Sequence, residues 1–167
     1  MFQINDTVLY GAQGVCRITE ITRRAVDGRQ IDYYVLKPLF NKGGTLLVPM
    51  GNAALLSRMR PVLSREELHG LIGALAQKTS PWIENENERK EKYRQALTSA
   101  DRLDLLCLLR ALYEHRQTLL GLGKKVHAID ERFCKDAEKI VCDEFSYVLD
   151  IERDQVTPYI QTCLAGN

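Results

Sequence analysis

The sequence predicts an α+β protein, in which a small bent β-sheet or barrel precedes a compact domain of four or five helices. Two observations lead to this prediction. Short runs rich in Val, Ile, Tyr and Thr alternate with glycine-containing turns in the first third, whereas apolar residues at helical spacing dominate the remainder. The chain has 167 residues, 45% of them hydrophobic, which suits one or two domains with a real core. We expect domains at residues 1–62 and 63–167.

Glycine marks the turns of the predicted sheet. Asp27-Gly28, between two of the runs, is a strong hairpin signal because both turn positions require positive φ. In one run, Cys16 and Ile18 alternate with polar neighbours, so one face of that strand is expected to be wet and basic. An open edge of so small a sheet either docks another protein or is covered by the second half of the chain. The runs are residues 7–10, 15–22, 31–36 and 45–48.

Capping residues set the helix boundaries in the second half. Ser64 and Glu67 form a capping box that opens a helix. Ser80 before Pro81 predicts a further helix with Ser80 as its N-cap, because proline at the first helical position loses no hydrogen bond. The helical stretches expected in this half are residues 65–77, 81–97, a helix that starts at 99–101, is apolar on most sides over 103–113 and ends at 121–123, then 129–149 and 156–160.

Trp82 is the only tryptophan of the chain and falls in the first turn of the helix predicted at 81–97. It either packs over a neighbouring helix or is presented to a partner. On a helical projection it lies within roughly 20° of Tyr93 and close to Arg89, which gives an aromatic and basic face. Such a face suits nucleic acid, because the ring can wedge between bases while cations reach phosphates. A solvated helix held by i,i+4 ion pairs would carry a similar pattern.

The net charge of +1 conceals an asymmetry between the two halves. Residues 1–60 hold eight Lys and Arg against four Asp and Glu, a net of +4, and the rest hold fifteen against eighteen, a net of −3. Any nucleic-acid surface on the second half is therefore a local patch. The candidate DNA-binding residues are Trp82, Arg89, Lys90, Arg94, Lys124 and Lys125.

Several classes of function are not supported by any pattern in the sequence. The chain has no phosphate-binding glycine loop, no nucleophile motif and no convincing acid–base pair, so we expect no catalytic residue, no cofactor and no small-molecule substrate. His115 and His127 are expected at the surface or at helix caps. The sequence has no run of about 18 apolar residues, so we expect no membrane partner. Its start does not look like a leader, so we expect no export.

The five cysteines are odd in number and widely spaced, and none has metal-ligand spacing. We therefore expect no metal site and predict buried, reduced thiols, which fit a reducing cytoplasm. The cysteines are Cys16, Cys107, Cys134, Cys142 and Cys163.

Two sets of residues carry a resemblance to a known family. The first half contains Phe2-x-x-Asn5-Asp6-x-Val8-x-Tyr10, Gly14-Val15, Tyr33-Tyr34-Val35-Leu36 and Leu47-Val48-Pro49. The second half contains Trp82, Tyr93-Arg94, Leu109-Arg110, Gly123-Lys124-Lys125 and Asp130-Glu131. The first set resembles the RNA-polymerase-interacting, Tudor-like domain of the CarD/CdnL family, a module also found in the transcription-repair coupling factor. The second set resembles the helical domain of the same family.

The resemblance implies a Tudor/SH3-like first domain that binds the β subunit of bacterial RNA polymerase, at positions that map to Arg24, Val26 and Leu47. It also implies that the helical domain contacts promoter DNA near the upstream edge of the melted region. There, Trp82 would enter the minor groove and steady the open complex. The alternative is a non-catalytic adaptor whose helical domain binds another protein rather than DNA.

Overall fold

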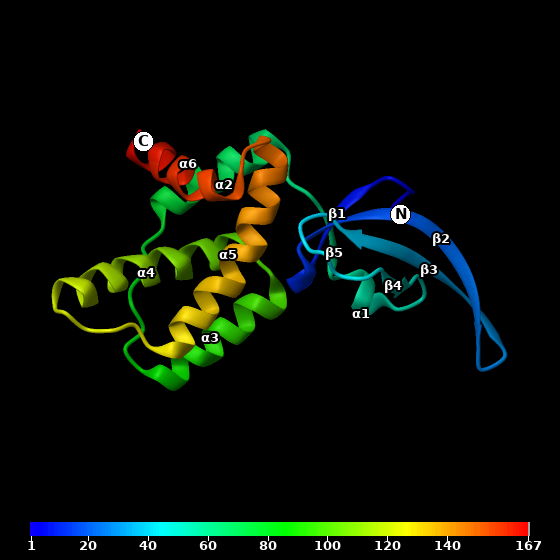
Figure 1. Ribbon diagram of the computed structural model, residues 1–167, viewed down its shortest axis with the longest axis horizontal. Coiled ribbons are helices and arrows are strands. Elements are labelled where there is room, and N and C mark those ends of the chain that lie inside the picture. Colours follow the sequence, from blue (N-terminus) through cyan, green and yellow to red (C-terminus); the bar gives the residue numbers. More distant parts are fainter. Residues whose placement is uncertain (167) are drawn as a thin grey trace. The chain divides into compact units, whose positions relative to one another are not determined.

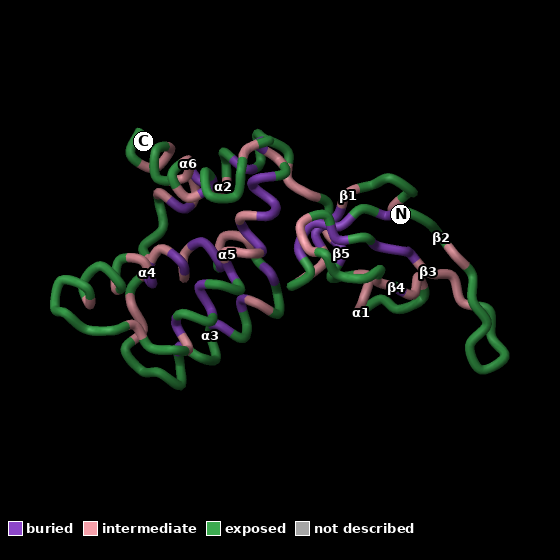
Figure 2. The backbone as a smooth tube through the Cα atoms, in the orientation of Figure 1, coloured by how far each residue is buried: buried purple, intermediate pink, exposed green. Residues whose placement is uncertain are grey.

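The computed structural model describes residues 1–166 and divides into two compact units, Met1–Val62 and a second that begins at Leu63. Figure 1 shows strands in the first unit and helices in the second, which confirms the predicted α+β class. Buried stretches follow the inner strands of the sheet and the inward faces of the helices (Figure 2). No helix within residues 1–166 is both long and apolar enough to cross a membrane.

The N-terminal unit is an antiparallel sheet that, over the described residues, has five strands in the order β4-β3-β2-β1-β5 and is not closed into a barrel. A 3-10 turn and the short helix α1 (Ala53–Leu56) complete this unit. The predicted strand runs are all found, and the hairpin strands extend several residues further than expected. The strands are β1 (Thr7–Tyr10), β2 (Val15–Val26), β3 (Arg29–Pro38), β4 (Leu46–Pro49) and β5 (Met59–Pro61).

The long hairpin of β2 and β3 turns at Asp27 and Gly28, as predicted, and both residues have positive φ (50° and 77°). The pairing register shifts between Ile18 and Glu20, which is a β-bulge in β2. The pairing of β4 along β3 extends to Tyr33, so the hairpin continues beyond it as a two-stranded ribbon.

One face of the sheet carries the core of this unit. The burial of Cys16 there raises the pKa of its thiol to about 11, so this thiol stays protonated and unreactive. The buried core residues are Val8, Cys16, Ile18, Tyr34, Leu36, Val48 and Met59.

The second unit contains the five helices that follow Leu63 in the described chain. The predicted capping box is present: Ser64 Oγ accepts a hydrogen bond from the Glu67 amide at 3.1 Å, and the Glu67 carboxylate accepts one from the Ser64 amide at 2.7 Å. Asp101 caps α4. The helices are α2 (Arg65–Gln77), α3 (Glu86–Ser99), α4 (Arg102–Gly121), α5 (Ala128–Leu149) and α6 (Arg153–Ala165).

The predicted start of the helical segment 81–97 at Pro81 is wrong. α3 begins at Glu86, because Asn85 Oδ1 accepts hydrogen bonds from the amides of Asn87 and Glu88, both at 3.0 Å. The hydroxyl of Ser80 accepts a hydrogen bond from Arg110 Nη2 at 3.0 Å instead of capping a helix. Trp82 therefore lies in an irregular segment, residues 78–85, between α2 and α3.

Asp143 of α5 is buried without a hydrogen bond to any described residue. Nε of Arg153 is 2.9 Å from one of its oxygens, but without hydrogen-bond geometry. Burial raises the pKa of Asp143, and Arg153 opposes this shift. A carboxyl group whose pKa rises on folding destabilises the protein as the pH climbs through its folded pKa.

We therefore expect Asp143→Asn to raise the melting temperature at pH 7, with a gain that shrinks as the pH falls through the raised folded pKa of Asp143 and vanishes below its unfolded pKa of roughly 3.9. Thermal unfolding between pH 3 and pH 7 measures this dependence. The matched control is Asp136→Asn, an exposed carboxyl on the same helix, which is expected to change little. A gain that is the same at every pH would show that charge burial is not the cause.

Candidate functional site

Strand register places the three predicted polymerase-contacting residues on one face of the sheet. Leu47 pairs with Val35 of β3, Arg24 pairs with Ile31, and Val26 pairs with Arg29. Cross-strand partners share a face, and residues two apart along a strand share it too. Arg24, Val26 and Leu47 therefore lie on the same face, opposite the core, which we call the outer sheet face.

The outer sheet face is accessible at these positions. Val26 and Leu47 are 41% and 37% exposed, and Arg24 is exposed. Leu47 also belongs to β4, one of the two edge strands of the sheet, where backbone groups are open to strand addition. The face thus offers exposed apolar side chains and cations along the hairpin and, at β4, a free edge.

Trp82 is partly buried and lies flat against α4. Its ring stacks on His115, with centroids 3.7 Å apart and planes 8° from parallel. The guanidinium carbon of Arg89 lies 4.6 Å from the indole centroid, within cation–π range. The indole therefore packs over a neighbouring helix, yet part of it remains open to solvent.

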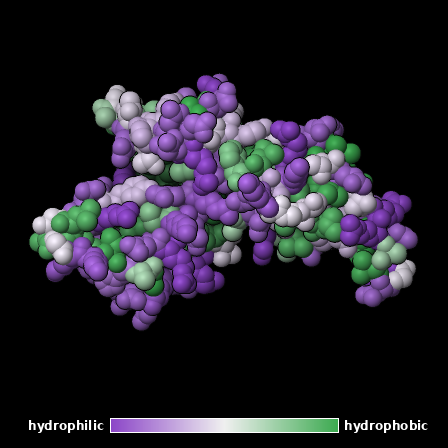
Figure 3. All heavy atoms as spheres, in the orientation of Figure 1, coloured by the Kyte–Doolittle hydropathy of each residue, from purple (hydrophilic) through white to green (hydrophobic). Residues whose placement is uncertain are grey.

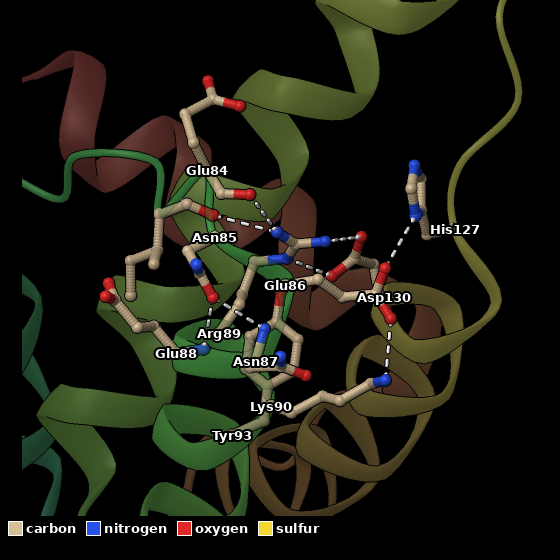
Figure 4. Close-up of polar contacts among 11 residues, drawn as sticks. Glu84, Asn85, Glu86, Asn87, Glu88, Arg89, Lys90, Tyr93, His127 and Asp130 are labelled. Carbon is tan, nitrogen blue, oxygen red and sulfur yellow. Dashed lines mark hydrogen bonds and ion pairs between the residues drawn. The ribbon is translucent and has the colours of Figure 1, made fainter.

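Arg89 is turned inward and is only 4% exposed (Figure 4). Its Nε and Nη2 donate to the two carboxylate oxygens of Asp130 on α5, at 2.8 and 3.1 Å. Its Nη1 donates to the carbonyls of Ile83 and Glu84, at 2.9 and 3.2 Å. Because these bonds occupy the guanidinium inside the unit, we leave Arg89 out of the proposed DNA-contacting set.

Tyr93 completes the buried cluster. Its hydroxyl donates to Asp130 at 2.8 Å, and its ring stacks on Phe133 with centroids 4.0 Å apart. Burial, together with the Asp130 carboxylate, raises the pKa of Tyr93 well above its usual range. The aromatic and basic face predicted from the helical projection therefore faces the core.

The remaining candidate cations are at the surface. Lys90 pairs with Glu86 at 2.7 Å. The carboxylate of Glu86 also lies 3.7 Å from the ring of His127, which ends the loop that carries Lys124 and Lys125. Arg94 lies one turn further along α3. Surface ion pairs contribute about 0–1 kcal/mol, so a phosphate can replace such a carboxylate at small cost.

Arg94 is already engaged within its own helix. It binds both carboxylate oxygens of Glu91, at 2.6 and 2.9 Å, and this contact lowers the pKa of Glu91 to about 2. Its side chain is nevertheless 65% exposed. Arg94 and Lys90 are thus accessible cations with replaceable partners, unlike Arg89.

Sequence reasoning missed the structural roles of His115 and Asp130. A signal for Asp130 was present, since Asp130, Phe133, Ala137, Ile140 and Glu144 follow helical spacing along the buried face of α5. Buried acids are usually paired with a cation, which for Asp130 is Arg89. The sequence held no comparable signal for His115. Residues 1–166 contain no group of three or more His, Cys, Asp or Glu that could hold a metal ion, and the five cysteines are free thiols.

Comparison with known proteins assigns the N-terminal unit to a domain family. The model of the CarD-like/TRCF RID domain matches residues 2–63, the segment that folds as the N-terminal unit. A search of curated proteins gave no match to the chain. Domains of this kind are non-catalytic modules that bind RNA polymerase. Residues 2–63 are therefore a CarD-like/TRCF RID domain, consistent with the CarD/CdnL family.

Proposed function

We propose that this chain is a bacterial transcription regulator that binds the β subunit of RNA polymerase through its sheet and promoter DNA through its helical unit. It acts in the cytoplasm, at the upstream edge of the melted region, and stabilises the open complex. The observation that carries the proposal is the family match over residues 2–63.

The outer sheet face supports the polymerase contact. Hydrophobic side chains are visible at the surface of the strand-rich unit in Figure 3. Exposed apolar residues beside a cation are common at protein interfaces, where a few anchors supply most of the binding energy. Val26 near the tip of the hairpin and Leu47 on β4 are such anchors, and Arg24 adds a charge two residues from Val26.

The helical unit supports a DNA contact made with help from the polymerase. Trp82 keeps an accessible part of its indole, and Lys90, Arg94, Lys124 and Lys125 are exposed. Few phosphate contacts suffice when a tethered partner raises the local concentration of the protein beside the promoter. Binding to free duplex DNA is accordingly expected to be weak and sensitive to salt.

The double variant Arg24→Glu/Leu47→Glu tests the polymerase contact. We expect its affinity for the isolated β-subunit lobe to fall at least about tenfold, because losing one interface anchor costs more than about 1–2 kcal/mol. Biolayer interferometry with the full chain measures this. Arg58→Glu, an equally drastic charge reversal between α1 and β5, is the control and is expected to bind normally. Wild-type affinity of the double variant would exclude the outer sheet face as the docking surface.

The second candidate function is a protein adaptor whose helical unit binds another protein. Two observations favour it: Arg89 is committed to the interior, and the indole of Trp82 is stacked on His115. An adaptor needs no promoter contact. A helical unit that never crosslinks to promoter DNA in the polymerase complex would favour this candidate.

A further inference from the structure

One guanidinium joins three separate parts of the helical unit. Arg89 of α3 binds the carboxylate of Asp130 on α5, the backbone carbonyls of residues 83 and 84, and the ring of Trp82 (Figure 4 shows the first two sets of contacts). An arginine has five N–H donors in a fixed plane. Here Nε and Nη2 donate to the Asp130 carboxylate, and Nη1 donates to the two carbonyls. This arrangement ties the segment that carries Trp82 to two helices at once.

A second arginine holds the other end of the same segment. Arg110 of α4 donates to the carbonyls of Leu75 and Lys78 and to the hydroxyl of Ser80. Arg110 thus fixes the chain before Trp82, and Arg89 fixes the chain after it. His115, one helical turn beyond Arg110 on α4, supplies the surface on which the indole lies.

We propose that Arg89 is a positioning residue for Trp82, which holds the indole and its segment in one orientation from α3 and α5. The inference rests on the proposed function, in which Trp82 meets promoter DNA. A ring fixed before binding loses less conformational entropy when it engages a base than a ring on a free loop. Arg89 therefore contributes to promoter opening without touching DNA.

Lysine cannot replace Arg89 in this role. Lysine keeps the positive charge, but its compact ammonium lacks the planar fork that reaches a carboxylate and two carbonyls simultaneously. Arg89→Lys therefore separates charge from geometry. Arg94→Lys is the matched control, since it makes the same replacement on the same helix at a surface ion pair.

The single tryptophan gives a direct readout of its own position. In Arg89→Lys we expect acrylamide to quench the Trp82 fluorescence at least twice as efficiently as in the wild type, with lower anisotropy and unchanged far-ultraviolet circular dichroism. Arg94→Lys is expected to match the wild type in all three. In a polymerase assay, Arg89→Lys is expected to lower the lifetime of the open complex severalfold.

The outcomes separate this inference from the proposed function. If acrylamide quenches Arg89→Lys no more than the wild type, the inference is overturned, whether or not Trp82→Ala shortens the open-complex lifetime. Increased quenching with an unchanged open-complex lifetime also overturns it if Trp82→Ala shortens that lifetime. If Trp82→Ala has no effect, the proposed function fails, and quenching alone decides whether Arg89 positions the ring.

Tyr93→Phe provides a second test should Arg89→Lys fold poorly. It removes one hydrogen bond to Asp130 and keeps the aromatic stack on Phe133. We expect a smaller rise in quenching, in the same direction as for Arg89→Lys. No change in Tyr93→Phe would contradict a role for this cluster in holding Trp82.

Discussion

Replacing Arg89 by alanine is expected to lower the free energy of unfolding of the helical unit by about 3–5 kcal/mol, the usual cost of removing one partner from a buried ion pair. Asp130, which is 1% exposed, would lose its cation partner, and the carbonyls of Ile83 and Glu84 would lose their donor. Urea unfolding of the full chain, followed by circular dichroism at a helical wavelength, measures the loss.

Arg94→Ala is the control for this prediction. Its ion pair with Glu91 is exposed, and exposed pairs contribute about 0–1 kcal/mol. A similar loss in the two variants would mean that burial does not distinguish the two arginines. The comparison therefore tests the inward orientation of Arg89 directly.

Trp82→Ala is expected to reduce the stability of the open complex by roughly ten- to a hundredfold. Stacking an aromatic ring on an unpaired base contributes about 1–3 kcal/mol, and each 1.4 kcal/mol is a factor of ten. The lifetime of competitor-resistant complexes at a single promoter measures the effect, at concentrations that saturate the polymerase.

Two comparisons show whether that loss is specific. Trp82→Phe keeps a ring that can stack and is expected to retain most of the effect. The unfolding free energy of Trp82→Ala is expected to fall by less than the roughly 3–5 kcal/mol of a fully buried aromatic residue, because the indole is partly exposed. A full core-sized loss of stability, with an unchanged open-complex lifetime, would assign Trp82 a structural role only.

Local sequence signals predicted most of the sheet and most of the helices. Asp27-Gly28 located the long hairpin, and Ser64 with Glu67 located the start of α2, because a turn or a cap depends on neighbouring residues alone. β5 was outside the predicted runs. Its three residues have no strand pattern of their own and become a strand by pairing with β1.

The common face of the predicted polymerase-contacting residues Arg24, Val26 and Leu47 could not be read from the sequence. Cys16 and Ile18 face the core, and simple alternation would place Arg24 and Val26 on that same side. The bulge after Ile18 inserts one residue, so the even-numbered residues that follow it change to the outer sheet face. A bulge of this kind is set by the pairing of two strands.

The error at Trp82 had a related cause. Ser80-Pro81 is a good cap signal, but Asn85 offers another, and contacts distant in sequence decide between them. Arg110 binds the Ser80 hydroxyl, and Arg89 binds the carbonyls just before Asn85. The helical projection correctly grouped Trp82 with Arg89, although the group faces inward.

The proposed function requires that Trp82 meets promoter DNA while the sheet holds the polymerase. Its most direct test places a photo-crosslinking phenylalanine analogue at position 82 and irradiates the complex of full chain, polymerase and promoter. We expect crosslinks to bases at the upstream edge of the melted region, which disappear without polymerase and in the Arg24→Glu/Leu47→Glu variant. Crosslinks to protein alone, or equal crosslinks to free duplex DNA, would contradict it.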